Sequence, residues 1–148
     1  MDILEATNGE GEESYGNTDR KRFITREEEK GMVVLYPKDN ELFIDCDTEE
    51  HFSNFIELFE ILNNNVKIFD PPGEKYYEEI EIWESKGGSP GKHIIVPLPF
   101  DVSSVERIAY QAALGSDPKR EILSLIRLKN GDDFPTIFVE KPGFEGRK

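Results

Sequence analysis

The chain has 148 residues, which fits one domain, and its 31 acidic and 18 basic side chains give a formal net charge of −13. The single cysteine, Cys46, excludes an internal disulfide framework and a cysteine-rich zinc module, and no apolar run is long enough to span a membrane. The first residues lack a charged segment followed by an apolar one, so we expect no secretory signal, no membrane partner and a cytoplasmic location.

The charge is unevenly distributed along the chain. Residues 41–84 carry a net charge of −11, whereas residues 85–148 carry a net charge of +2. A negative surface opposes loose, nonspecific binding to nucleic acid, which needs basic side chains. The asymmetry indicates where a cation or an anionic ligand could bind.

The first 30 residues are polar, with few apolar side chains and many Glu, Gly, Asn and Thr. Such a stretch has little apolar surface to bury, so burial cannot offset the entropy that ordering removes. We therefore expect residues 1–30 to be an acidic tail that is disordered or loosely attached. Residues 31–148 then form a single domain.

Two strands and a helix are predicted at the start of the domain. Residues 32–36 and 41–47 are apolar runs separated by the turn sequence of residues 37–40, which predicts a hairpin. Residues 49–63 repeat apolar side chains at three- and four-residue intervals, which is typical of an amphipathic helix. One residue of the Asp47-Thr48 pair marks its beginning.

The middle of the domain is predicted to contain three strands. A short strand at residues 66–69 precedes a loop at residues 70–75 that contains two prolines and a glycine. Residues 79–84 alternate apolar and acidic side chains, as a half-buried strand does. Residues 85–91 form a glycine-rich turn, and residues 92–97 form the returning strand.

Two helices and a last strand complete the chain. A capping box, Ser-x-x-Glu at residues 103–106, opens a helix over residues 105–114. Asp117-Pro118 begins a second helix that reaches about residue 129, and residues 136–140 form a strand. This order of elements predicts an α+β fold, with a mainly antiparallel sheet and helices packed on one face.

Asp45-Cys46-Asp47, at the end of the second strand, is the first candidate site. Alternation along a strand places Asp45 and Asp47 on one face and Cys46 on the other. Two carboxylates on one face can hold a hard divalent cation such as Mg²⁺ or Mn²⁺. In the structural alternative, Asp47 caps the next helix, Asp45 is a solvated residue at the strand end, and Cys46 is a small core residue.

The segment Ser85–His93 is the second candidate. Its three glycines allow backbone N–H groups to approach an anion. Hydroxyl, ammonium and imidazole donors come to the same place from Ser85, Lys86, Lys92 and His93. Phosphate is the natural ligand for such a set, although the spacing differs from that of a Walker A loop. The structural alternative is a plain hairpin turn with a half-buried histidine.

Asp117 is the third candidate, because it stands alone between two predicted helices. Its structural alternative is an N-cap, since Asp before Pro commonly begins a helix. His51 is expected on a helix surface, and the Asp132-Asp133 pair is expected to be solvated in a loop.

The order of these motifs is more specific than any one of them. An apolar strand ends in Asp45-Cys46-Asp47, the Ser85–His93 segment leads into another apolar strand, and the isolated Asp117 follows. This order resembles the catalytic core of the archaeo-eukaryotic primase superfamily, especially the small primase-polymerase domains of plasmids and phages. The resemblance covers about residues 32–127. Phe43–Asp47 is similar to the family's metal-binding motif, and Ser85–His93 is similar to its nucleotide-handling motif.

The resemblance implies an RRM-like core and metal-dependent nucleotidyl transfer. A nucleoside triphosphate and single-stranded nucleic acid would be the partners, with catalysis by positioning and charge neutralisation around two divalent ions, Mg²⁺ or Mn²⁺. The residues that would hold the ions, and so be catalytic, are Asp45, Asp47 and Asp117. The residues that would bind the nucleotide are Ser85, Lys92 and His93.

Two other functions fit the same sequence. One is a non-enzymatic acidic interaction protein, such as a phage-type inhibitor or nucleic-acid mimic, because the acidic residues 41–84 could occupy a basic cleft on a protein partner. The other is an accessory nucleotide-binding domain, or a degenerate member of the family, that uses the same loop without polymerisation. Binding of Mg²⁺ or Mn²⁺ at Asp45 and Asp47 separates the enzyme from the mimic, which needs no metal.

Overall fold

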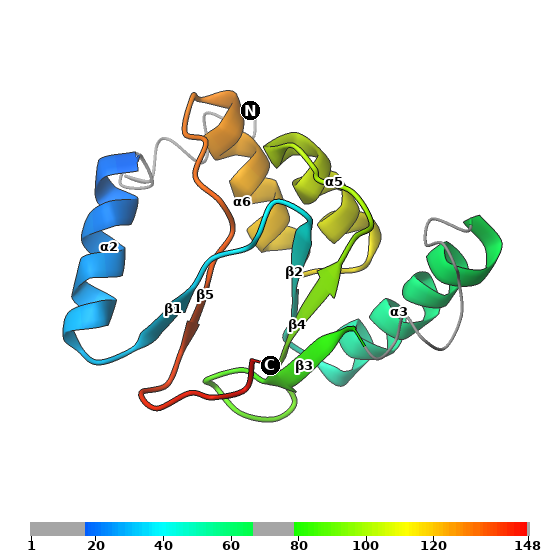
Figure 1. The fold of residues 1–148 in the computed structure, drawn as a ribbon, viewed down its shortest axis with the longest axis horizontal. Coiled ribbons are helices and arrows are strands. Elements are labelled where there is room, and N and C mark those ends of the chain that lie inside the picture. Colours follow the sequence, from blue (N-terminus) through cyan, green and yellow to red (C-terminus); the bar gives the residue numbers. More distant parts are fainter. Residues whose placement is uncertain (1–16, 67–78, 148) are drawn as a thin grey trace.

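The computed structural model describes residues 17–66 and 79–147. Helices and antiparallel strands together build this part of the chain (Figure 1), which confirms the α+β class. In chain order the elements are α2 (Asn17–Glu29), β1 (Val33–Leu35), β2 (Glu41–Cys46), α3 (Glu49–Glu60), the π-helical turn η2 (Ile61–Val66), β3 (Glu81–Glu84), β4 (Lys92–Pro97), α5 (Ser104–Ala113), α6 (Pro118–Lys129) and β5 (Phe138–Glu140).

The described strands form two antiparallel sheets. β4 lies at the centre of the larger sheet, with β2 on one side and β3 on the other. β1 and β5 pair with each other in a smaller sheet, which lies beside α2 in Figure 1. The predicted hairpin across residues 85–91 is therefore confirmed as β3 and β4. The predicted hairpin of residues 32–36 with residues 41–47 is wrong, because β1 pairs with β5 and β2 pairs with β4.

The turn before β2 is bound to the chain that follows β4. Leu98 N donates to Asn40 O at 2.7 Å, and Asn40 Nδ2 donates back to Leu98 O at 2.9 Å. Val102 N donates to Asp39 O at 2.9 Å. These hydrogen bonds fix the start of β2 beside the end of β4, and β1 is left to pair with a strand from the other end of the described chain.

α3 covers one face of the larger sheet. Phe55 and Phe59 are buried in a cluster that includes Ile44 of β2 and Ile94 of β4. The two phenylalanine rings stack with their centroids 5.8 Å apart. Burial of each large side chain in such a core stabilises a fold by about 1.5–3 kcal/mol, so this cluster is a main source of the stability of the domain.

The helix predicted over residues 49–63 is observed as α3 followed by η2. Its N-cap is Thr48, whose hydroxyl accepts a hydrogen bond from His51 N at 3.1 Å. Asp47 is therefore not the cap. Of the strand expected at residues 66–69, the first residue belongs to η2 and the others lie outside the described residues, as does the loop at residues 70–75.

The other face of the larger sheet packs against β5. Phe138 lies between two rings: it stacks on Phe43 with centroids 4.4 Å apart and on His93 with centroids 4.0 Å apart. Trp83 meets both Phe138 and His93 edge to face. The small sheet thus holds the ring of His93 in a fixed aromatic environment.

α2 occupies part of the stretch expected to be a tail. Its Ile24 is only 6% exposed, and the helix contacts β1. Residues 17–29, which we expect to belong to a disordered or loosely attached tail, form this helix, in which Ile24 is buried and Phe23 is half-buried. Residues 1–16 lie outside the described part of the chain. None of the helices within residues 17–66 and 79–147 is both long and apolar enough to cross a membrane.

Candidate metal centre

The candidate site forms where β2 and β4 run side by side. The antiparallel register pairs Asp45 directly with His93, and His93 lies on the face that packs against β5. His93 Nε2 is 3.6 Å from Asp45 Oδ1. Cys46 points to the opposite face, where it is fully buried in the core cluster with α3. The predicted position of Cys46 in the core is thus confirmed.

The free edge of β2 is bound by the segment from α5 to α6 instead of by another strand. Phe43 N donates to Gln111 Oε1 at 2.9 Å, and Asp45 N donates to Ser116 Oγ at 3.0 Å. Arg120 Nη2 donates to Phe43 O. Side chains therefore satisfy the backbone groups that an edge strand would otherwise leave open to another strand.

The connector between α5 and α6 carries Asp117 to this edge. Gly115 ends α5 with a φ of 81°, a backbone conformation that glycine adopts without the penalty of a Cβ atom. Asp117 N then donates to Asp45 O at 2.8 Å, which fixes the two residues side by side. Asp117 also caps α6, since its carboxylate accepts from Lys119 N at 3.2 Å. The predicted N-cap is confirmed, and it coexists with a position at the site.

Three carboxylates meet at this point. Asp45, Asp47 and Asp117 each place an oxygen within 4.8 Å of the others. Asp47 is exposed, whereas Asp45 and Asp117 are half-buried. Within residues 17–66 and 79–147, no other set of three acidic, histidine or cysteine side chains comes as close together. The structure thus brings together all three of the aspartates singled out in the sequence.

Neighbouring charged groups and burial change the pKa of the Asp45 carboxyl group. Burial raises the pKa of this carboxyl group above its usual range, and the nearby carboxylates of Asp47 and Asp117 raise it further. Arg120 and His93 act in the opposite direction. A group of carboxylates that repel one another in a half-buried place is the arrangement that a bound cation relieves. Burial, together with Asp45 and Asp47, also raises the pKa of the Cys46 thiol to about 12, which leaves it unreactive at neutral pH.

His93 is held by a buried carboxylate on its far side. Glu140 Oε2 lies 2.5 Å from His93 Nδ1, and Glu140 is only 1% exposed. Nδ1 is therefore the ring atom that faces Glu140, and Nε2 is the ring atom that faces Asp45. Stacking on Phe138 fixes the plane of the ring. The histidine is therefore oriented from two directions toward the acidic group.

The other two predicted nucleotide-binding residues are not brought into this group. Lys92 neighbours His93 on β4 and so points to the opposite face, where its Nζ lies 5.9 Å from the centre of the Phe52 ring. Ser85 closes the turn between β3 and β4, with its backbone N donating to Gly91 O at 3.0 Å. No contact of either side chain with the three aspartates is present among the described residues.

Sequence reasoning missed three residues that support the site: Ser116, Arg120 and Glu140. Ser116 precedes Asp117, and Arg120 follows it by three residues, so their nearness in sequence to a candidate ligand indicates a place beside the site. Glu140 carried no local sign, because its partner His93 is distant in sequence and the pairing of β1 with β5 decides where it lies.

Comparisons with protein-family models, with curated proteins and with solved structures find no match for this chain. Three carboxylates within 4.8 Å of one another can coordinate a hard divalent cation, and an imidazole protonated on both nitrogens beside them can donate to an anionic group bound to that cation.

Proposed function

We propose that Asp45, Asp47 and Asp117 hold Mg²⁺ or Mn²⁺, and that the domain is a primase-polymerase-like nucleotidyltransferase domain. The observation that carries this proposal is that Asp117, about 70 residues away in sequence, comes within 4.8 Å of both Asp45 and Asp47. The same three residues occupy the positions that the resemblance to the archaeo-eukaryotic primase superfamily assigns to the catalytic carboxylates.

The donor set fits a hard divalent cation. All three groups offer carboxylate oxygens, which Mg²⁺ and Mn²⁺ prefer, and the buried Cys46 thiol points away from the site. When bound, such an ion neutralises charge on a reacting phosphate and lowers the pKa of a coordinated hydroxyl. The exposure of Asp47 leaves one side of the group open to a ligand.

The residues around the aspartates have separate roles in this proposal. In the imidazolium form, in which both ring nitrogens carry a proton, His93 donates a hydrogen bond from Nε2 to a phosphate oxygen of the nucleotide, while Nδ1 donates to Glu140, which keeps the ring in this orientation. Arg120, which also binds the carbonyl of Phe43, adds positive charge behind Asp45. Lys92 is the first residue of β4, and Ser85 lies in the turn between β3 and β4. A role in nucleotide binding requires the side chains of both residues to reach around this end of β4.

The test is calorimetry with Mn²⁺ and a nucleoside triphosphate, followed by primer extension on a single-stranded template. We expect the wild-type protein to bind Mn²⁺, and Asp45→Asn with Asp47→Asn to abolish this binding while the fold persists. The matched control is Glu28→Gln with Glu29→Gln, which removes the same charge from exposed positions on α2 and should leave Mn²⁺ binding unchanged.

The outcomes separate the candidate functions. Equal and negligible Mn²⁺ binding by the wild-type protein and the double Asn variant contradicts the proposal and favours the acidic interaction protein. Binding of metal and nucleotide without primer extension supports the metal site and contradicts autonomous polymerisation. His93→Ala should weaken binding of the triphosphate and spare binding of Mn²⁺.

A further inference from the structure

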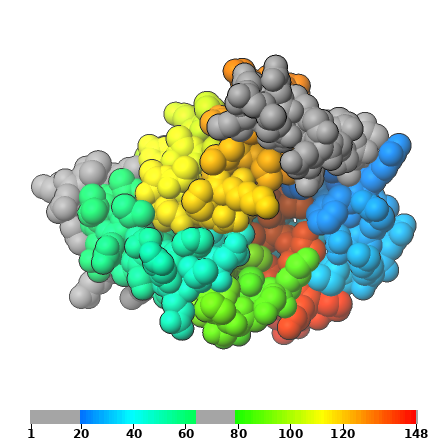
Figure 2. Space-filling view, turned by 180° about the vertical axis from the view of Figure 1, so that it is seen from behind, coloured from blue at the N-terminus to red at the C-terminus, as the bar shows by residue number. Residues whose placement is uncertain are grey.

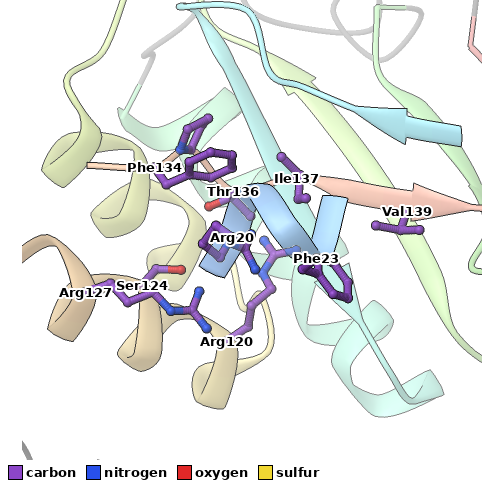
Figure 3. A pocket seen from close by; sticks show the side chains of 10 residues that line it. Arg20, Phe23, Arg120, Ser124, Arg127, Phe134, Thr136, Ile137 and Val139 are labelled. Atoms are coloured by element: carbon purple, nitrogen blue, oxygen red, sulfur yellow. The ribbon is translucent and has the colours of Figure 1, made fainter. Parts of the chain in front are cut away.

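A second recess lies between α2, α6 and the segment that leads into β5. It has a volume of about 230 Å³, and Figure 3 shows the side chains that surround it. In the space-filling view of Figure 2, blue α2 and orange α6 stand on either side of a hollow on this face of the molecule. The three aspartates described above are not among its lining residues.

The lining of this recess is basic, in contrast to the chain as a whole. Three guanidinium groups line it, those of Arg20, Arg120 and Arg127, and no carboxylate does. Acidic residues lie nearby. Glu121 pairs with Arg120 at 2.8 Å, and Arg120 also acts on Asp45. Asp132, which is itself near Asp133, is close enough to Arg127 and Arg20 for both to lower its pKa against the effect of burial. None of these carboxylates lines the recess, so guanidinium groups are the charged groups that its lining offers to a ligand. Such a recess attracts an anion.

Aromatic rings lie beside the guanidinium groups. The Arg20 guanidinium lies over the ring of Phe23 at 5.9 Å and over the ring of Phe134 at 5.3 Å, measured to the ring centres. Ser124 and Thr136 add hydroxyl groups to the lining. Flat rings and flat guanidinium groups are the surfaces on which nucleobases stack, and guanidinium groups bind phosphate in a bidentate manner.

The size of the recess limits its occupant. Sites that enclose a drug-sized molecule have roughly 300–1,000 Å³, so about 230 Å³ holds one planar group and leaves the remainder of the ligand at the surface. Arg120 connects the two sites, because its guanidinium lines the recess and also donates to the carbonyl of Phe43 on β2, two residues before Asp45.

We propose that this recess binds one nucleotide unit, with its base against Phe23 and Phe134 and its phosphate on Arg20 and Arg127. The unit comes either from a free nucleotide or from a single strand that passes the acidic group. Binding in the recess needs no metal, so the inference goes beyond the proposed function and can hold or fail independently of it.

The experiment is a titration of the ¹⁵N-labelled protein in EDTA, followed by amide chemical shifts. The probes are inorganic phosphate, adenosine 5′-monophosphate and a ten-nucleotide oligodeoxythymidine. We expect the mononucleotide to shift the amides of Ser124, Thr136 and Val139 and to spare those of Asp45 and Asp47. The expected affinity for the mononucleotide is at least about ten-fold above that for phosphate alone, because base stacking adds to phosphate binding.

The variant Arg20→Gln with Arg127→Gln should weaken nucleotide binding by about ten-fold or more. The matched control is Arg26→Gln with Lys129→Gln, which removes two exposed charges from the same two helices outside the recess and should change the affinity less than about two-fold. Phe134→Leu, which keeps an apolar side chain, should reduce the advantage of the mononucleotide over phosphate.

Several results would overturn the inference. These are shifts confined to residues outside the recess, phosphate binding as tight as mononucleotide binding, or equal losses in the arginine variant and its control. Tighter binding of the oligonucleotide than of the mononucleotide identifies a single strand as the source, and the reverse order identifies a free nucleotide. Either order supports a nucleotide site.

Discussion

At the residue scale, the half-buried carboxyl group of Asp45 lowers the stability of the fold when it is ionised. Burial raises its pKa, so the folded protein disfavours the ionised form relative to the unfolded chain. A carboxyl whose folded pKa is raised binds protons more tightly when folded, so its contribution to stability falls as the pH rises from its ordinary pKa through the raised value. At neutral pH the ionised group therefore destabilises the fold until a cation binds.

Asp45→Asn should accordingly raise the melting temperature at pH 7 in EDTA, because the buried charge and its repulsion by Asp47 and Asp117 are removed. Added Mn²⁺ should raise the melting temperature of the wild type and leave that of the variant unchanged. Differential scanning calorimetry with and without Mn²⁺ checks both statements. Asp101→Asn, an exposed substitution with the same charge change, is the control. A lower melting temperature for Asp45→Asn in EDTA would contradict this account.

Glu140 gives a second residue-scale prediction. Its carboxylate 2.5 Å from His93 Nδ1 orients the ring, so Glu140→Gln should weaken nucleoside triphosphate binding about ten-fold while Mn²⁺ affinity changes less than about two-fold. Calorimetry measures both affinities, and the ¹⁵N shifts of the imidazole should report a changed proton position on His93. Equal losses for metal and nucleotide would show a general structural role instead.

At the scale of elements, the connector after α5 decides whether Asp117 reaches β2. Gly115 and Gly131 both follow a helix with positive φ, 81° and 90°, so alanine at either position should cost about 1–2 kcal/mol of stability. Only Gly115 adjoins the site, and a Cβ there would also lie 3.3 Å from Leu58. We expect Gly115→Ala to weaken Mn²⁺ binding and Gly131→Ala to leave it unchanged. Denaturant unfolding and calorimetry on both variants check this, and equal Mn²⁺ affinities would contradict it.

The elements that were predictable from sequence are those with a local cause. The strand over residues 92–97 and the capping box of α5 follow from alternation and from a fixed spacing of side chains. The pairing of β1 with β5 was not predictable, because the local sequence pattern of a strand does not indicate which distant strand it pairs with. α2 was missed because its polar sequence hides one buried residue, Ile24.

The same distinction applies to the site. The Asp45 and Asp47 pair follows from period two along a strand, and Asp117 follows from its isolated place between helices. Asp117 meets Asp45 and Asp47 because hydrogen bonds join the α5–α6 connector to the free edge of β2. These hydrogen bonds are visible only in the folded chain. Lys92 and His93 adjoin in sequence, but adjacent strand residues face opposite sides of a sheet, so only His93 lies beside Asp45.

At the scale of the whole molecule, acidic and basic side chains gather at two separate places. The acidic group lies at the end of β2, and the basic recess lies between α2 and α6, with Arg120 contributing to both surroundings. A cation bound at the acidic group would reduce the repulsion among its carboxylates. A phosphate bound in the recess would reduce the repulsion among its guanidinium groups. Above all, we propose that the three aspartates form a cation site.

A crystal of the protein soaked in MnCl₂ and measured for anomalous scattering at the manganese edge tests this claim most directly. The account predicts a peak within about 2.5 Å of a carboxylate oxygen of each of Asp45, Asp47 and Asp117. A peak elsewhere, or none beside these three residues at millimolar Mn²⁺, would contradict it.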